Sequence, residues 1–396
     1  MKKIIALLLA MVMVFALVAC STTKTEEPQT ETETPATEGE TPATEGETET
    51  PATEGETETP ATETPATDVV AGVFWYDFSD AFLSTVRDAL GTALTAAGVT
   101  YTDYDAASTQ ATQNDQIDTA ISQGANLLIV NIVDTAAVDA AQAIAEKAQS
   151  AGIPLIFFNR EVNDDVVNSY DNCCFVGTRA AEAGEMQGEM AGEYLVANYD
   201  AVDLNGDGNL SYIMMKGELG NNEAEARTQY AIEFANAKLT EAGKPELVYY
   251  DANNSDKFQA SNWKKEIAFD LMSTALGTNP MEGDNPIEVV FANNDDAALG
   301  VIEALNNAGW NNGEAEKTIP VFGVDYTADA AAAIEAGKMT GSILQSAEGM
   351  ANTIAALAQN VQAGKNVFEG AVDNYNTVEG VAKIQVPYEM KQAAAE

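Results

Sequence analysis

Short apolar runs alternate along this chain with segments in which apolar residues recur every three or four positions. Residues 126–133 are mostly apolar and contain the uninterrupted apolar run 127–130, as expected for a strand buried on both faces of a parallel sheet. Phe82, Val86, Leu90 and Leu94 lie four positions apart and would share one face of a helix. This alternation predicts an α/β fold with doubly wound, Rossmann-like sheets.

The alternating part begins near residue 68 and continues for about 330 residues, which is more than a single hydrophobic core usually serves. Two α/β lobes are therefore expected. The predicted strands are residues 69–76, 126–133, 154–158, 210–215, 247–250, 287–292, 319–324 and 341–344. The predicted helices include residues 136–151, 184–194, 224–242, 263–276, 297–308, 328–337 and 347–363.

Residues 1–20 have the pattern of a lipoprotein signal peptide. Lys2 and Lys3 precede a short apolar stretch that ends in Leu17-Val18-Ala19-Cys20, which resembles a lipobox. Cys20 is therefore expected to carry the lipid, and the mature protein to be anchored at the extracytoplasmic face of the cell membrane. The alternative is an ordinary signal peptide with an incidental cysteine.

Residues 21–67 are a low-complexity segment. The unit Pro-Ala-Thr-Glu-Gly-Glu starts at Pro35, Pro42 and Pro51, and there are no aromatic residues. Such a segment cannot bury enough apolar surface to fold, and its prolines and glutamates favour an extended chain. We expect a disordered spacer rich in Thr, Glu and Pro.

Composition excludes several classes of protein. The chain contains no histidine, so Ser-His-Asp and Cys-His catalysis and histidine-ligated zinc or iron are excluded. The formal net charge of −43 argues against nucleic acid as a partner. The adjacent Cys173 and Cys174 could form a strained disulfide, but the apolar residues that follow them favour two buried thiols in a strand.

One loop has the spacing of a calcium site. Oxygen-bearing side chains occupy positions 1, 3, 5 and 9 of an EF-hand loop, and glycine occupies position 6, in the segment Asp203-Leu204-Asn205-Gly206-Asp207-Gly208-Asn209-Leu210-Ser211. The usual glutamate at position 12 is replaced by Met214, within an apolar strand. A last carboxylate ligand would have to come from elsewhere in the fold. The alternative is an Asx turn that binds no ion.

Polar residues follow several of the predicted strands. Asp80, Asn159, Asn294 and Asp325 all stand just beyond a strand, and ligands of doubly wound sheets bind at the carboxyl ends of the strands. The same residue types also cap helices, so capping is the alternative role.

A glycine series lies on one of the predicted helices. Gly184, Gly188 and Gly192 recur every four residues. This spacing favours close packing against another helix over a phosphate site.

The chain resembles a known family in several segments. The similarity runs from about residue 69 to 388 and is to the galactose/glucose-binding proteins, which are type I periplasmic-type substrate-binding proteins of sugar ABC importers. The segments that carry it are Asn114-Asp115-Gln116-Ile117-Asp118, Phe157-Phe158-Asn159, Ser169-Tyr170-Asp171, the calcium-type loop, Ala224-Glu225-Ala226-Arg227-Thr228, Ala292-Asn293-Asn294-Asp295 and Val321-Phe322-Gly323-Val324-Asp325.

The resemblance implies two lobes joined by a three-segment hinge, with a sugar held in the cleft between them. The amino-terminal lobe would comprise residues 68–178 and 346–385. The carboxyl-terminal lobe would comprise residues 179–345 and 386–396.

The resemblance also implies a set of sugar-binding residues. The matching polar positions are Asp80, Asn159, Arg227, Asn294 and Asp325, and Phe82 matches an aromatic that stacks on the sugar ring. At three further positions this chain departs from the family and has Asn221, Glu223 and Gln345. The second stacking aromatic aligns with Ser255, and Trp75, Phe258 and Trp263 are the possible replacements.

For calcium, the resemblance implies that Glu288 supplies the distant carboxylate. The ligand set would be Asp203, Asn205, Asp207, the carbonyl of Asn209, Ser211 and Glu288, and the Ca²⁺ would be structural.

The function implied is that of a lipid-anchored, monomeric solute-binding protein rather than an enzyme. It would capture a galactose- or glucose-type aldohexose and deliver it to an ABC permease, with a chemoreceptor as a further partner. The alternatives are a different monosaccharide on the same fold and a carboxylate-based glycosidase. A sugar-responsive repressor and a cell-wall protein that docks through the calcium loop fit the sequence less well.

Overall fold

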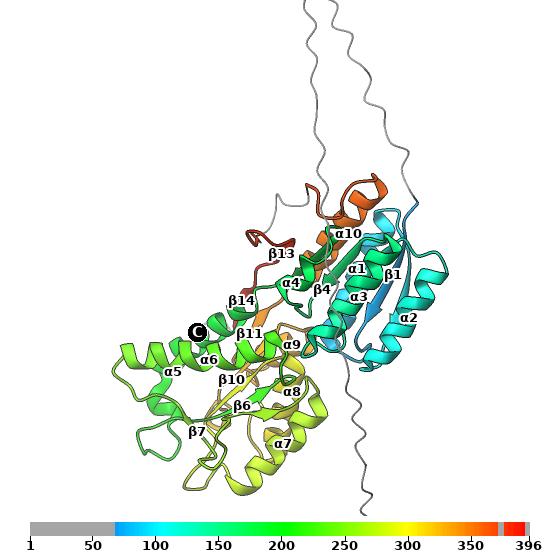
Figure 1. The fold of residues 1–396 in the computed structure, drawn as a ribbon. Coiled ribbons are helices and arrows are strands. Elements are labelled where there is room, and N and C mark those ends of the chain that lie inside the picture. The colour runs from blue at the N-terminus through cyan, green and yellow to red at the C-terminus, as the bar shows by residue number, and fades with distance from the viewer. Residues whose placement is uncertain (1–67, 371–375, 393–396) are drawn as a thin grey trace, which may run out of the picture. The chain divides into compact units, whose positions relative to one another are not determined.

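The computed structural model describes residues 68–370 and 376–392, and within them two lobes, each built on a mostly parallel sheet (Figure 1). In the amino-terminal lobe the strand order is β12-β13-β5-β4-β3-β1-β2, and all neighbours are parallel except β12 and β13. The strands are β1 (Val70–Trp75), β2 (Thr100–Asp105), β3 (Leu127–Val130), β4 (Leu155–Phe158), β5 (Cys173–Gly177), β12 (Asn376–Thr377) and β13 (Lys383–Gln385).

The sheet of the carboxyl-terminal lobe has the order β14-β11-β10-β9-β6-β7, and β8 pairs with β6. Only β14 runs antiparallel to its neighbour. The strands are β6 (Ser211–Lys216), β7 (Val248–Tyr249), β8 (Gln259–Ala260), β9 (Val289–Ala292), β10 (Val321–Asp325), β11 (Gly341–Leu344) and β14 (Glu389–Gln392).

Helices cover both faces of the amino-terminal sheet because successive strand side chains point to opposite faces. On β1, Val73 and Trp75 pack in the core shared with α1 and α10, whereas Phe74 packs in the core shared with α2 and α3. The helices of this lobe are α1 (Ala81–Ala96), α2 (Gln110–Ser122), α3 (Val138–Ala151), α4 (Asp164–Val167) and α10 (Ala347–Gln362).

The carboxyl-terminal sheet is covered in the same way. On β6, Ile213 and Met215 face α7, α8 and α9, whereas Tyr212 and Met214 face α5 and α6. The helices are α5 (Ala180–Val202), α6 (Asn222–Glu241), α7 (Lys265–Thr278), α8 (Asp295–Asn307) and α9 (Ala328–Glu335), with a 3₁₀ turn at Ala315–Lys317.

Three crossovers connect the two sheets. The first follows β5 and contains Thr178, the second follows β11 and contains Gln345, and the third joins β13 to β14 and contains Tyr388. The predicted α/β fold with two doubly wound lobes is confirmed.

Strand β2 and helix α2 were not predicted from the sequence. The β2 sequence, Thr-Tyr-Thr-Asp-Tyr-Asp, forms the edge of its sheet, with each residue exposed or half-buried. An edge strand of this kind lacks the apolar run by which the buried strands are recognised.

Two predictions about packing are confirmed. Cys173 and Cys174 are free, buried thiols. A Cβ atom at Gly188 would stand 2.6 Å from the carbonyl oxygen of Ala231, and one at Gly184 would stand 2.9 Å from that of Ala226. The glycine series therefore lets α5 pack closely against α6.

The predicted signal peptide, Cys20 and the spacer lie outside the described residues. Within the part of the chain that the structure describes, no helix is both long and apolar enough to cross a membrane.

Candidate functional site

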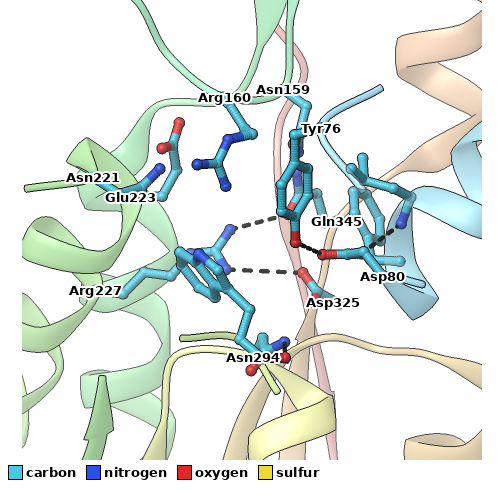
Figure 2. A pocket seen from close by; sticks show the side chains of 13 residues that line it. Tyr76, Asp80, Asn159, Arg160, Asn221, Glu223, Arg227, Asn294, Asp325 and Gln345 are labelled. Carbon is cyan, nitrogen blue, oxygen red and sulfur yellow. Dashed lines mark hydrogen bonds and ion pairs between the residues drawn. The ribbon is translucent and has the colours of Figure 1, made fainter. Parts of the chain in front are cut away.

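A pocket lies at the carboxyl ends of the strands and is lined by residues of both lobes (Figure 2). The space between its walls, including the open mouth, is about 400 Å³. All nine residues to which the sequence analysis assigned a sugar-binding role line it. The full lining is Tyr76, Asp80, Phe82, Leu83, Asn159, Arg160, Asn221, Glu223, Arg227, Trp263, Asn294, Asp325 and Gln345.

Three of these side chains are helix N-caps. Asp80 accepts a hydrogen bond from Leu83 N at 2.8 Å, and Asn221 accepts one from Ala224 N at 2.9 Å. Asn294 caps α8 in the same manner. Each residue thus caps a helix and also lines the pocket, so the two roles do not exclude each other.

Arg227 lies at the centre of the polar network. It projects from α6 and is 4% exposed. Its Nη1 donates to the carbonyl of Asn293 at 2.8 Å and lies 3.8 Å from Oδ1 of Asp325. Its Nη2 donates to Oε1 of Gln345 at 3.0 Å. These contacts fix the plane of the guanidinium group.

Four buried polar atoms of the pocket residues have no hydrogen-bond partner within the part of the chain that the structure describes. They are Oε2 of Glu223, Nε of Arg227, Nε1 of Trp263 and Nε2 of Gln345. Buried polar groups are nearly always paired. One acceptor and three donors are therefore available to a ligand that carries both kinds of group.

Two acidic residues of the pocket, Glu223 and Asp325, have raised pKa values. Burial raises the pKa of Asp325 well above its usual value, although Arg227 acts to lower it. Burial, followed by the charge of Glu161, raises the pKa of Glu223. In both cases the cause is that a carboxylate loses hydration in a low-dielectric setting.

Phe82 and Trp263 give the pocket two aromatic side chains. Phe82 comes from α1 in the amino-terminal lobe, and Trp263 precedes α7 in the other lobe. Ser255, with which the second stacking aromatic aligns in the sequence, is exposed and lies outside the pocket lining. Of the other two possible replacements, Trp75 is buried in the core and Phe258 packs against Lys216.

Sequence reasoning missed Tyr76, Leu83 and Arg160 in the lining. The Tyr76 hydroxyl donates to Oδ2 of Asp80 at 2.6 Å, and the guanidinium of Arg160 lies 4.2 Å from the centre of the Tyr76 ring. The sequence did contain a signal for both positions, because Tyr76 ends a predicted strand and Arg160 directly follows Asn159, and ligands bind where such strands end.

Several contacts join the lobes around the pocket. Arg160 pairs with Glu218, and the Glu161 amide donates to Oε1 of Glu223 at 3.1 Å. Nζ of Lys264 lies 2.8 Å from Oδ2 of Asp77. A ligand in the pocket would therefore contact side chains of both lobes.

The calcium-type loop folds back onto the strand segment that bears Glu288. The two carboxylate oxygens of Glu288 accept hydrogen bonds from Leu204 N and Ser211 N, each at 2.7 Å. The Asp203 carboxylate accepts from three amides of the loop, including Gly208 N at 2.9 Å. The hydroxyl of Ser211 donates to the carbonyl of Pro286.

The loop meets some but not all requirements of a calcium site. Glu288 is buried. Burial is the main cause of its raised pKa, and the charges of Asp203 and Asp207, which act on the Glu288 carboxylate, raise it further. Across the described residues, however, no three acidic or cysteine side chains are clustered as metal ligands. Oxygens that accept a single amide retain a second lone pair, so the donor set suits a hard cation.

Comparison with known proteins places the chain in a family. Residues 71–366 match the family model described as periplasmic binding protein domain. The chain is 34% identical over 306 residues to the D-galactose/methyl-galactoside binding periplasmic protein of Haemophilus influenzae, covering 77% of this chain and 85% of the relative. It is 29% identical to a putative rhizopine-binding protein of Rhizobium meliloti, covering 79% and 86%.

Solved structures agree with this placement. An ABC transporter solute binding protein from Bacillus halodurans with bound myo-inositol is 25% identical, with a TM-score of 0.63 and coverage of 83% of this chain and 96% of the other. The chain belongs to the periplasmic binding protein family. More narrowly, it is a type I solute-binding protein of the kind that serves sugar ABC importers.

Proposed function

We propose that this protein binds one monosaccharide, of the galactose or glucose type, in the pocket between its lobes. The observation that carries the proposal is the set of four unpartnered buried polar atoms on Glu223, Arg227, Trp263 and Gln345. Sugar hydroxyls donate and accept hydrogen bonds at the same time, so they can satisfy an acceptor and several donors. Phe82 and Trp263 add aromatic faces for the C–H side of a pyranose ring.

The relative that binds D-galactose and methyl-galactoside supports an aldohexose. Asn221, Glu223 and Gln345 are where this chain departs from the family pattern, and all three line the pocket. A site that hydrogen-bonds one hydroxyl rejects a sugar that lacks it. A different monosaccharide is therefore the second candidate.

The protein would act as a receptor rather than an enzyme. It would bind the sugar as a monomer, present it to an ABC permease and serve a chemoreceptor as a further partner. Lipidation at Cys20 would anchor it to the extracytoplasmic face of the membrane, and residues 21–67 would act as a spacer.

We also propose that the loop binds a structural Ca²⁺. Asp203, Asn205, Asp207, the carbonyl of Asn209, Ser211 and Glu288 would hold it. The ion would neutralise the mutual repulsion of the three carboxylates and fix the loop to the strand of Glu288.

A panel of sugars tests the function. The purified protein is titrated with galactose, glucose, ribose, xylose and arabinose while its thermal unfolding is followed, and each sugar is then analysed chemically. We expect galactose or glucose to raise Tm and to be recovered unchanged. A shift with another sugar alone would favour the second candidate. Conversion of a sugar would point to the glycosidase alternative.

A further inference from the structure

Tyr388 lies behind the pocket rather than in its lining. It is buried in the third crossover, and its hydroxyl oxygen accepts a hydrogen bond from Nη2 of Arg227 at 2.9 Å. The same hydroxyl lies 2.7 Å from that of Thr178. Because arginine can only donate, Tyr388 accepts from it and its own proton is available to Thr178. Arg227 is thus held from behind by a side chain outside the pocket.

This network reaches all three crossovers. Thr178 belongs to the first crossover, Gln345 to the second and Tyr388 to the third. Nη2 of Arg227 donates to both Gln345 and Tyr388. In proteins that close by a hinge, the connecting segments absorb the change in backbone angles. The orientation of Arg227 is therefore tied to the segments that would move.

We propose that Tyr388 is a positioning residue for Arg227, and that the chain Thr178–Tyr388–Arg227–Gln345 couples ligand contact to the three crossovers. The proposal rests on the proposed function, in which Arg227 contacts the sugar. The Tyr388 ring also packs 5.9 Å from the guanidinium carbon. A substitution that keeps the ring and removes only the hydroxyl separates the hydrogen bond from the packing.

The experiment compares Tyr388→Phe, Thr178→Val and the double variant, each titrated calorimetrically with D-galactose and D-glucose. We expect Tyr388→Phe to weaken binding about tenfold, since the lost hydrogen bond involves a charged group. Thr178→Val should weaken it less. The double variant should bind no more weakly than Tyr388→Phe, because residues of one network are not additive.

Tyr249→Phe is the matched control. The Tyr249 hydroxyl is buried in the carboxyl-terminal lobe and has no hydrogen-bond partner among the described residues, so its removal should leave the affinity unchanged. If Tyr388→Phe binds within twofold of the parent, or if the losses in the double variant add, the proposal is overturned. If Tyr388→Phe does not fold, Thr178→Val serves as the test, and an affinity equal to that of the parent overturns the proposal.

A measurement without ligand separates this proposal from the proposed function. Amide hydrogen exchange of residues 177–179 and 344–346 should be faster in Tyr388→Phe than in the parent and unchanged in Tyr249→Phe. If the parent binds neither hexose, the sugar assignment fails while the exchange rates still test the network. Unchanged exchange in Tyr388→Phe would then refute it.

Discussion

Lys264 and Asp77 join the two lobes through an ion pair, with Nζ 2.8 Å from Oδ2. Lys264 also donates to the hydroxyl of Ser79 at 3.0 Å. Burial alone would raise the pKa of Asp77, but hydrogen bonds from Lys264, Ser79 and Ser108 hold it well below its usual value. The pair lies between the lobes, so it exists only when they are together.

Lys264→Gln should therefore weaken sugar binding. Without the ion pair, the arrangement in which the lobes meet loses stabilisation, and we expect a loss of about two- to fivefold in affinity for a partly exposed pair. Lys265→Gln is the matched control, because Lys265 pairs with Glu303 within one lobe. Calorimetric titration measures both. Equal affinities of the two variants would show that the inter-lobe pair does not stabilise binding.

Glu223→Gln should raise the thermal stability at pH 7 and lower the affinity for sugar. Burial raises the pKa of Glu223 in the folded protein, so its ionised form is disfavoured there relative to the unfolded chain. The resulting cost is absent at a pH well below the usual glutamate value of about 4.3 and is present above it. The variant should thus have a higher Tm than the parent at pH 7, and this difference should shrink as pH falls towards 4. Sugar affinity should fall, since an acceptor for a hydroxyl is replaced.

Glu225→Gln should change the Tm at pH 7 in the opposite direction to Glu223→Gln. Burial acts to raise the pKa of Glu225, but the hydrogen bonds from Lys216 and from the Gly220 amide and the charge of Lys216 together outweigh it, and the pKa is lowered. Its ionised form therefore stabilises the fold at neutral pH, and that contribution is lost as pH falls below the usual range. Removing the charge should lower Tm at pH 7. Thermal unfolding curves at pH 4 and pH 7 that moved alike for both variants would contradict the assignment.

The alternation of buried strands and helices predicted the fold because strands such as β3 and β4 are apolar throughout. The pocket could also be predicted, since Asp80, Asn159, Asn294 and Asp325 follow strands whose carboxyl ends meet at one edge. Trp263 could not be placed. It lies in an irregular segment with Asn262 and Trp263 at φ of 50° and 65°, and no apolar period sets its direction. Arg160 and Tyr388 were missed because their contacts come from residues distant in the sequence.

Trp263→Leu should weaken sugar binding about tenfold, because an aromatic face contributes roughly 0.5–1.5 kcal/mol beyond the area it buries. Trp263→Phe should retain most of the affinity. Ser255→Ala, at the position that aligns with the family's second stacking aromatic, should leave the affinity unchanged. Titration of the three variants tests the placement. A loss of affinity in Ser255→Ala with none in Trp263→Leu would contradict the role of Trp263 as the second stacking aromatic.

Removal of calcium should lower the thermal stability more than it changes the sugar affinity. The proposed ligands hold the loop to the strand of Glu288 and lie apart from the pocket lining. A ligand that binds only the folded state stabilises it by mass action, by about 2.7 kcal/mol at a hundred times its Kd. Differential scanning calorimetry with Ca²⁺ and with a chelator should therefore give different Tm values.

Glu288→Gln should abolish the calcium dependence of Tm. Asp284→Asn is the control, because Asp284 is exposed and contributes to the loop only a main-chain carbonyl, which accepts from Asn205. An identical Tm with and without chelator in the parent would refute the calcium proposal and leave the sugar site untouched.

Calorimetric titration of the purified protein with D-galactose and D-glucose, alongside the Glu223→Gln variant, is the decisive test of monosaccharide binding in the pocket. The account predicts saturable, one-to-one binding of at least one of these sugars by the parent protein and weaker binding by the variant. No saturable binding of any monosaccharide in the panel, or equal binding by parent and variant, would contradict it.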